Sequence, residues 1–198
     1  LAVSDDFLYR RGNFNGTWDQ LICDALMEVK GADASFSPGF RWGTTLLPGD
    51  TITMERLMDQ TAITYPQTSL TNMTGETIKT IMEDVCDNLF NADPYYQQGG
   101  DMVRVGGIEY SVTPAQTIGK RINDMRINGK PVDAKKTYKV AGWAPVGENA
   151  EGAPIWEIVS TYLRDKKVIK GIKLNEPTLI GVKKSNPGIE DFRGVMKP

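Results

Sequence analysis

An arginine on a turn-rich loop is the residue best placed for chemistry in this sequence. Residues 34–50 read Ala-Ser-Phe-Ser-Pro-Gly-Phe-Arg-Trp-Gly-Thr-Thr-Leu-Leu-Pro-Gly-Asp, so Arg41 lies between two aromatic residues and is flanked by glycines. Proline fixes φ, and glycine permits positive φ and close approach of a ligand to the backbone. A guanidinium held in this way suits two-point binding of phosphate, sulfate or carboxylate. A surface salt bridge is the alternative role for Arg41.

Other arginines and aromatic residues lie beside turn-forming segments. Arg10 and Arg11 precede the start of a helix, where free backbone N–H groups also attract anions, although two solvated arginines would give the same pattern. Trp143 is carried by a second glycine-rich loop and is either a stacking platform or a lid on the core. The candidate substrate-binding residues beside Arg41 are Arg10, Arg11, Tyr65, Tyr95, Tyr96, Gly99, Gly100, Gly142 and Trp143.

Composition excludes several kinds of catalyst. None of the 198 residues is histidine, which excludes Ser-His-Asp and Cys-His pairs and imidazole-bound zinc within the chain. The formal charge of −2 gives no reason to expect nucleic acid or an anionic membrane as partner. No apolar run approaches the roughly 18 residues of a membrane span. Cys23 and Cys86 are isolated among apolar residues, which favours buried thiols over a disulfide.

The first half of the chain predicts helices separated by short strands. Thr17-Trp18-Asp19-Gln20 is typical of a capping box, and apolar residues at steps of three and four predict a helix from there to about Lys30. A short strand then enters the Arg41 loop, and Thr53 caps a brief helix. Residues 61–70 are predicted as a strand interrupted at Tyr65-Pro66, with Tyr65 displayed. A second amphipathic helix begins at residues 74–76.

The second half predicts mainly strands. Residues 102–112 contain Gly106-Gly107, which indicates a hairpin or bulge, and Asn128-Gly129 is a strong signal for a two-residue hairpin. Residues 137–141 are predicted as a strand that ends before the loop carrying Trp143. A third helix is expected around residues 155–163, and a late strand at residues 178–182. No repeat or linker divides the chain, so we predict one α+β domain over residues 1–198.

Several stretches resemble the C-terminal domain of the 5'-nucleotidase family, in the same order along the chain. They are residues 31–33 (Gly-Ala-Asp), the loop ending at Arg41, residues 47–50 (Leu-Pro-Gly-Asp), residues 73–75 (Met-Thr-Gly) and residues 127–133 (Ile-Asn-Gly-Lys-Pro-Val-Asp). Within that family, residues 9–17, 99–107 and 141–146 are similar to the SoxB thiosulfohydrolases of the bacterial thiosulfate-oxidising system. The resemblance spans nearly the whole chain and implies an α+β fold with a mixed sheet and packed helices.

The resemblance implies a two-domain parent protein. Its N-terminal metallophosphoesterase-like domain, not included in this chain, would carry a dinuclear manganese site, and the chain alone is expected to be inactive. The implied substrate is the SoxYZ carrier protein, whose glycine-rich C-terminal arm bears an S-sulfonated cysteine. Hydrolysis would release sulfate, and the implied location is the periplasm. Arg41 matches the family's loop arginine and would hold the sulfonate oxygens.

The nucleotidases hold a nucleobase between two aromatic residues, and this sequence departs from their pattern. Trp143 falls near one of those aromatics and Tyr65 near the other. The family's three glycines, isoleucine and arginine are here Pro38-Gly39-Phe40-Arg41, and the Gly-Gly-Asp after the second aromatic is replaced by residues 146–149 (Val-Gly-Glu-Asn). These changes argue against a nucleotide substrate. A nucleotidase or phosphoesterase with an altered base pocket, and a non-catalytic module that docks the carrier, remain the alternatives.

Overall fold

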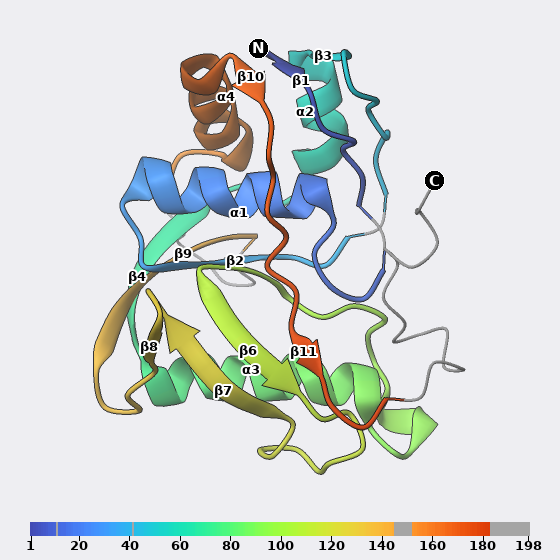
Figure 1. Ribbon diagram of the computed structural model, residues 1–198, viewed down its shortest axis with the longest axis vertical. Helices are drawn as coiled ribbons and strands as arrows, with labels where there is room; N and C mark the ends of the chain where they lie inside the picture. Colours follow the sequence, from blue (N-terminus) through green and yellow to red (C-terminus); the bar gives the residue numbers. More distant parts are fainter. Residues whose placement is uncertain (11, 41, 145–151, 183–198) are drawn as a thin grey trace.

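The computed structural model describes residues 1–10, 12–40, 42–144 and 152–182, which form four α-helices and three small sheets (Figure 1). The helices are α1 (Thr17–Lys30), α2 (Met54–Thr61), α3 (Gly75–Phe90) and α4 (Ile155–Lys166), with a 3-10 turn η1 (Pro94–Tyr96). The strands are β1 (Ala2–Ser4), β2 (Ala34–Ser37), β3 (Thr51–Ile52), β4 (Thr68–Thr74), β5 (Arg104–Gly106), β6 (Ile108–Val112), β7 (Ile122–Ile127), β8 (Lys130–Pro131), β9 (Thr137–Trp143), β10 (Val168–Ile169) and β11 (Thr178–Leu179). The predicted α+β class is confirmed.

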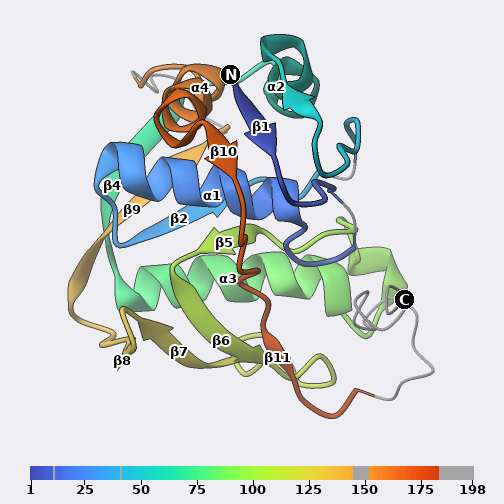
Figure 2. The same cartoon turned by 45° about the horizontal axis from the view of Figure 1, so that its top comes forward.

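A mixed sheet in the order β4-β9-β2-β5 separates two hydrophobic cores. Strands β2 and β9 are parallel, and the other pairs are antiparallel. Because side chains alternate along a strand, β9 contributes Tyr138 and Val140 to one core and Ala141 and Trp143 to the other. Helix α1 lies along one side of this sheet, and α3 lies on the opposite side (Figures 1 and 2).

Each core is closed by a further layer. Helices α2 and α4 and the sheet β10-β1-β3 lie beyond α1, and the sheet β11-β6-β7-β8 lies beside α3 (Figure 2). Trp18 and Leu21 of α1 are fully buried in the first core, and Ile78 and Met82 of α3 in the second. The free thiols of Cys23 and Cys86 are also buried, as predicted for the two cysteines.

Helix α1 begins as predicted, but its cap differs from the predicted capping box. Gly16 is the N-cap, and the Asp19 carboxylate accepts a hydrogen bond from the Gly16 backbone N–H (2.9 Å). Thr17 instead accepts a hydrogen bond from the Tyr9 N–H (3.0 Å) and donates one to the Phe7 carbonyl (2.5 Å). The hydroxyl thus ties the entry segment to the helix. The helix ends at the predicted position, with Gly31 in the left-handed conformation (φ 61°).

The predicted strand over residues 61–70 is wrong in its position. Helix α2, capped by Thr53 as predicted, continues to Thr61, whose hydroxyl donates to the Leu57 carbonyl (2.8 Å). Strand β4 begins only at Thr68, beyond Pro66, because proline has no N–H for a ladder. The strand then runs to Thr74, which caps α3 at the predicted position.

Gly106-Gly107 is neither a hairpin turn nor a bulge. Strand β5 pairs with β2 in the central sheet, whereas β6 pairs with β7 in the sheet beside α3. The two glycines therefore carry the chain from one sheet to the other beneath α1. Gly107 has a φ of +74°, and a Cβ on Gly106 would lie 2.4 Å from the Ser35 hydroxyl oxygen. Only glycine fits so close a crossing.

The other predicted strands are present with two differences, whereas β1, β3 and β10 were not predicted. Asn128 and Gly129 both have positive φ (53° and 72°) and join β7 to β8, which confirms the predicted hairpin. Strand β9 continues to Trp143, which was predicted to lie on a loop. The late strand β11 contains two residues rather than the predicted five over residues 178–182, and it pairs with β6.

Candidate functional site

The candidate residues are positioned mainly by one end of the central sheet. At this end the parallel strands β2 and β9 finish and β4 begins, with Phe36 paired to Gly142 and Thr68 paired to Trp143. The chain leaves β2 directly into the loop that contains Phe40. Tyr65 lies three residues before β4, on the same end of the sheet. Loops at the carboxyl ends of parallel strands are common places for ligand sites.

Three aromatic rings, two from this loop and one from the end of β9, form a cluster. The rings of Phe40 and Trp42 are stacked with centroids 3.9 Å apart, and the edge of Phe40 meets Trp143 at 5.8 Å. Trp42 is 50% exposed, whereas Trp143 is 5% exposed. The indole N–H of Trp143 donates to the Ser37 hydroxyl (2.8 Å). In the structure Trp143 is therefore part of the first core, and Trp42 offers the exposed aromatic surface.

The Arg10 guanidinium lies directly behind this loop and is 4% exposed. It donates to the Asp19 carboxylate (2.8 Å), to the Gln60 carbonyl (2.8 Å) and to the Pro38 carbonyl (3.1 Å). Its Cζ also lies 5.3 Å from the centre of the Phe40 ring. All three nitrogens are engaged within the protein, so Arg10 fixes the start of the loop relative to α1 and α2.

Asp19 lies between two buried arginines. Arg104, with a fully buried side chain, places its Nε 3.5 Å from the same Asp19 oxygen that Arg10 contacts. Burial raises the pKa of the Asp19 carboxyl, and the two guanidiniums and the Gly16 N–H act in the opposite direction. A second contact runs from Arg104 to the Gly12 carbonyl (2.9 Å). This charged cluster joins α1 and β5 to the segment before α1.

Glycines allow other segments to pack against the loop. A Cβ on Gly39 would lie 2.6 Å from the Met102 carbonyl oxygen and 2.7 Å from the Asp101 Cβ. The segment after Gly99 and Gly100 is thereby brought against the residues before Arg41. On the other side, a Cβ on Gly43 would lie 2.3 Å from the Gln60 side chain, which donates to the Thr44 carbonyl (3.1 Å). The loop is held closely from both sides.

The structure describes only some of the other sequence-predicted residues. Arg41 and Arg11 lie outside the described residues. Tyr65 is 56% exposed, consistent with a displayed side chain. Tyr95 and Tyr96 lie on η1 and contact each other edge to face at 5.9 Å, with exposed fractions of 86% and 58%. Within the described part of the chain, no hydrogen bond or ring contact joins this tyrosine pair to Phe40.

Sequence reasoning did not select Asp19, Arg104, Phe40 or Trp42 as site residues. A signal was present for Arg104, since a charged residue inside the apolar run Met102-Val103-Arg104-Val105 must be paired when the strand is buried. Asp19 was assigned only to the first turn of its helix. Its pairing with two arginines depends on how β5 and the segment before α1 pack, which no local pattern reveals.

The described residues offer neither a metal centre nor a membrane span. Within the ranges described above, no group of three or more His, Cys, Asp and Glu side chains is arranged to hold a metal ion. The helices in the same ranges are too short and too polar to cross a membrane.

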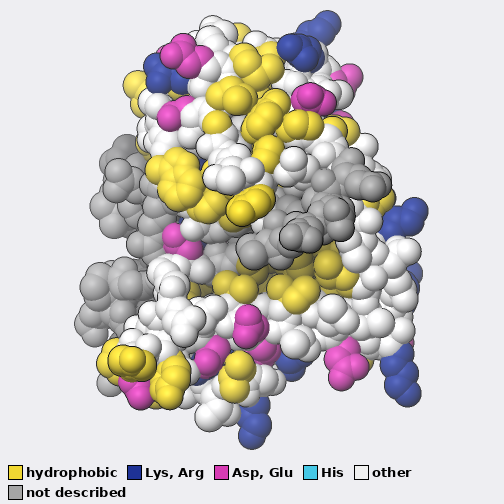
Figure 3. All heavy atoms as spheres, turned by 180° about the vertical axis from the view of Figure 1, so that it is seen from behind, with side chains coloured by type: hydrophobic (Ala, Val, Ile, Leu, Met, Phe, Trp, Pro, Cys, Tyr) yellow, Lys and Arg dark blue, Asp and Glu magenta, His cyan; other side chains and the backbone are white. Residues whose placement is uncertain are grey.

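Figure 3 shows hydrophobic side chains gathered on the upper half of the rear face. Trp42, Leu47 and Tyr65 are among the large hydrophobic residues exposed by half or more.

Comparison with known proteins gives a consistent result. Residues 4–157 match the family model described as the 5'-nucleotidase C-terminal domain. The structure of the Thermus thermophilus sulfate thiohydrolase SoxB in complex with glycerol is 37% identical in sequence, with a TM-score of 0.85, and the match covers 92% of this chain and 35% of that one. No curated protein matches.

Two further solved structures share the fold at low identity. The 5'-nucleotidase precursor from Thermus thermophilus is 16% identical with a TM-score of 0.70, and the match covers 92% of this chain and 39% of that one. The Haemophilus influenzae NAD nucleotidase is 16% identical with a TM-score of 0.67, and the match covers 90% of this chain and 37% of that one. The chain thus spans between a third and two fifths of the length of these solved relatives. Its match to the family model over most of its length shows that the chain belongs to the 5'-nucleotidase C-terminal domain family.

Proposed function

We propose that this chain is the substrate-binding domain of a Sox-system thiosulfohydrolase. The enzyme would hydrolyse the S-sulfonate group from a cysteine of the SoxYZ carrier protein and release sulfate. The observation that carries the proposal is the contrast in sequence identity. The chain is 37% identical to the sulfate thiohydrolase SoxB but 16% identical to two nucleotidases of the same fold, at similar coverage of this chain.

Arg41 would bind the sulfonate oxygens through its guanidinium. Its neighbours support this role, because Phe40 is held by Arg10 and Trp42 stacks on Phe40. Gly39 and Gly43 lie too close to Met102 and Gln60 for either to carry a side chain, so the chain before and after Arg41 packs against the rest of the fold. An arginine positioned before the substrate binds can stabilise charge that develops on the oxygens at little cost in reorganisation. Arg10 would act by positioning this loop.

The state of Trp143 supports a substrate other than a nucleotide. Its ring is buried against Phe40, and its N–H is engaged by Ser37, so it does not present an open face for base stacking. The exposed aromatic surface comes instead from Trp42 and Tyr65. Together with Tyr95, Tyr96, Gly99, Gly100 and Gly142, these residues would line the approach of the carrier's glycine-rich arm. Arg11 would add a second positive charge beside it.

The metal chemistry would come from another domain. The chain has no histidine, and the residues that the structure describes contain no group of carboxylates and thiols arranged for a metal ion, so these described residues do not fit a dinuclear manganese site. In the proposal, that site belongs to an N-terminal metallophosphoesterase-like domain and supplies the hydrolytic step. This chain would bind and orient the S-sulfonate and would be inactive alone. The proposed location is the periplasm.

The test uses the two-domain protein that contains this chain, reconstituted with manganese. It is given S-sulfonated SoxYZ and, separately, AMP, and the released sulfate and phosphate are quantified. We expect sulfate from the carrier and no phosphate from AMP. Unmodified SoxYZ is the matched control for background sulfate.

The alternatives give different results in the same assay. Phosphate from AMP without sulfate from the carrier would contradict the proposal and support a nucleotidase or phosphoesterase with an altered base pocket. Saturable binding of the carrier that needs no metal and is followed by no sulfate release would instead support a docking module. Each product has its own assay, so these outcomes are distinguishable.

A further inference from the structure

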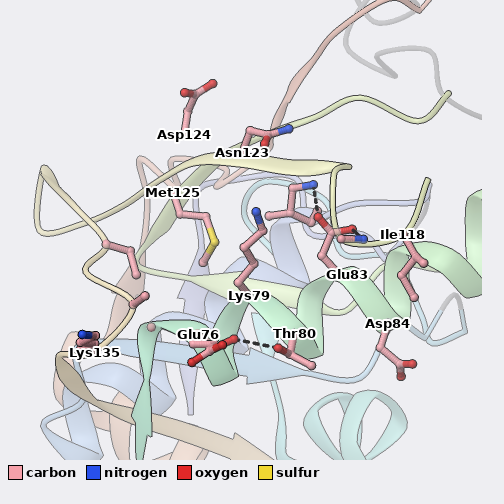
Figure 4. A pocket seen from close by; sticks show the side chains of 15 residues that line it. Glu76, Lys79, Thr80, Glu83, Asp84, Ile118, Asn123, Asp124, Met125 and Lys135 are labelled. Atoms are coloured by element: carbon pink, nitrogen blue, oxygen red, sulfur yellow. Dashed lines mark hydrogen bonds between the residues drawn. The ribbon is translucent and has the colours of Figure 1, made fainter. Parts of the chain in front are cut away.

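Two carboxylates are buried in the part of the chain that the structure describes, those of Asp19 and Glu83. Glu83 lies on α3 at the wall of a groove, and it accepts hydrogen bonds from three backbone N–H groups between residues 119 and 122 (Figure 4). These bonds satisfy the carboxylate locally and hold one loop against the helix. Asp19 is faced instead by the side chains of Arg10 and Arg104, which both reach beyond it.

Asp19 itself is fixed to a well-packed element. It lies in the first turn of α1, next to Trp18, which is fully buried in the first core. One carboxylate oxygen accepts the Gly16 N–H (2.9 Å). The other accepts from Nε of Arg10 (2.8 Å) and lies 3.5 Å from Nε of Arg104. Because an uncompensated buried charge is costly, this carboxylate holds both guanidiniums in place.

Arg10 links Asp19 to the loop that leads to Arg41. Its Nη2 donates to the Pro38 carbonyl (3.1 Å), and its Cζ lies 5.3 Å from the centre of the ring of Phe40, the residue directly before Arg41. Both contacts depend on the orientation that the Asp19 carboxylate gives to the guanidinium through Nε. The position of Asp19 therefore determines how the loop leaves β2.

Arg104 links Asp19 to two further segments. Its Nη2 donates to the carbonyl of Gly12, which directly follows Arg11 (2.9 Å), and lies 3.6 Å from the Asp101 carboxylate. The segment of Asp101 packs in turn on the Arg41 loop, since a Cβ added to Gly39 would lie 2.7 Å from the Asp101 Cβ. The segment before α1 and the segment after the paired glycines are thus held relative to the same carboxylate.

The two buried arginines therefore join three segments of the candidate site to one carboxylate on α1. We propose that Asp19 is a positioning residue of the substrate site, which acts through Arg10 and Arg104 and does not touch the substrate. This inference rests on the proposed function, in which Arg41 binds the sulfonate oxygens. Segments that are fixed before the substrate arrives allow Arg41 to act on the developing charge without reorganisation.

A double-mutant cycle in the two-domain protein separates positioning from a general loss of stability. Asp19→Asn keeps the shape of the side chain and removes its charge. It should lower kcat for the S-sulfonated carrier by about 10- to 100-fold, since a displacement of about 1 Å can cost as much. In an Arg41→Ala background the same change should lower kcat less than about threefold, because Asp19 acts through Arg41. An equal loss in both backgrounds, or no loss in the first, would overturn the proposal.

Glu83→Gln is the matched control, because it also removes the charge of a buried carboxylate, but on the opposite side of the central sheet. It should lower the thermal midpoint yet change kcat less than about twofold, since it holds a loop that is not part of the candidate site. A fall in kcat for Glu83→Gln as large as that for Asp19→Asn would mean that lost stability explains both, and the positioning role would be wrong.

A second measurement does not depend on the enzymatic reaction. The 198-residue chain is labelled with 5-fluorotryptophan, and the Trp42 resonance is assigned in 19F NMR spectra with a Trp42→Phe variant. Trp42 stacks on Phe40, so Asp19→Asn should shift this resonance, whereas Glu83→Gln should leave it in place. An unchanged Trp42 resonance in folded Asp19→Asn would contradict the proposal. If the unmodified two-domain protein releases no sulfate, the proposed function fails, and the Trp42 resonance still decides whether Asp19 positions the loop.

Thermal unfolding checks that each variant is folded. If Asp19→Asn does not fold, Arg104→Lys takes its place in both measurements. Lysine keeps a positive charge beside Asp19, but its single nitrogen cannot also hold the Gly12 carbonyl. We expect the same two results, a lower kcat that depends on the presence of Arg41 and a shifted Trp42 resonance. Wild-type values of both in folded Arg104→Lys would again overturn the proposal.

Discussion

The Trp143 indole N–H donates a 2.8 Å hydrogen bond to the Ser37 hydroxyl and so joins the ends of β9 and β2. Both side chains are buried. The bond fixes the point at which the chain leaves β2 for the Phe40 loop. It also explains why Trp143 lies within the core although the sequence around it is rich in glycine.

Trp143→Phe leaves the buried Ser37 hydroxyl without its donor, and Ser37→Ala leaves the buried Trp143 N–H without its acceptor. Each variant should therefore lower the free energy of unfolding by about 1–2 kcal/mol. The double variant should lose less than the sum of the two, by about 0.5 kcal/mol or more. Urea denaturation of the four proteins measures this coupling. Strict additivity would show that the hydrogen bond contributes nothing to stability.

Arg10 should be essential for stability. Arg10→Met removes one of two guanidiniums from the buried Asp19 carboxylate and leaves the Gln60 and Pro38 carbonyls without this donor. Breaking a buried ion pair from one side costs about 3–5 kcal/mol. Equilibrium denaturation provides the measurement, and Arg126→Met on the exposed hairpin is the matched control, with an expected change below about 0.5 kcal/mol. If Arg10→Met lowers the free energy of unfolding as little as the control does, then Arg104 and the Gly16 N–H suffice to stabilise the buried Asp19 carboxylate.

Arg41 should contribute to turnover rather than to folding. In the two-domain protein, Arg41→Ala should lower kcat for the S-sulfonated carrier by about 10²–10³-fold, the range found when one donor to a developing oxyanion is removed. Lys at this position should restore part of the activity, because it keeps the charge without the bidentate geometry. The thermal midpoint should stay near that of the unmodified protein. Full activity of the alanine variant would remove Arg41 from the mechanism.

The two cysteines should be unreactive in the folded protein. Burial raises the pKa of the Cys86 thiol to about 12, and burial also raises the pKa of the Cys23 thiol above its ordinary value. Because only the thiolate reacts, a raised pKa slows alkylation at pH 8 by about a hundredfold or more relative to a free cysteine. Mass spectrometry after treatment with iodoacetamide should show no modification in buffer and two in denaturant. Rapid labelling of the folded chain would contradict the burial of these thiols.

Asp87 should make stability depend on pH in the acid range. The hydrogen bond from Arg121, with a second from Asn91, lowers the pKa of the Asp87 carboxyl. A carboxyl whose pKa is lower in the folded state stabilises the protein above its unfolded pKa of about 3.9, and this contribution is lost as the pH falls through the folded pKa. Asp87→Asn should therefore be less stable at pH 7, with a difference that shrinks toward pH 2.

Denaturation curves at several pH values test this dependence. Asp84→Asn, on the same helix but exposed, should show little difference from the unmodified protein at any pH. A destabilisation of Asp87→Asn that stays constant between pH 7 and pH 2 would mean that the lost interaction is not ionic.

Much of the local structure was predictable because its signals lie within a few residues. Apolar periodicity located α1, α3 and α4, Thr53 and Thr74 marked two helix starts, and Asn128-Gly129 marked the hairpin. The predictions of secondary structure were wrong where pairing with a segment distant in the sequence determines how a strand begins or ends. Gly106-Gly107 resembles a turn, but the partners of β5 and β6 are in different sheets. The extent of β9 depends likewise on its pairing with β4 along its whole length.

The sequence by itself determined the α+β class, the family and the arrangement of turn residues around Arg41, since these follow from periodicity, turn chemistry and ordered motifs. Only the tertiary structure decided that Arg10 and Arg104 share the buried Asp19 and that Trp143 faces the core. These facts depend on which segments meet in space. A charge that is buried away from water must be paired, because an unpaired buried charge is costly. Which residue becomes its partner depends on distant segments and cannot be inferred from a local sequence pattern.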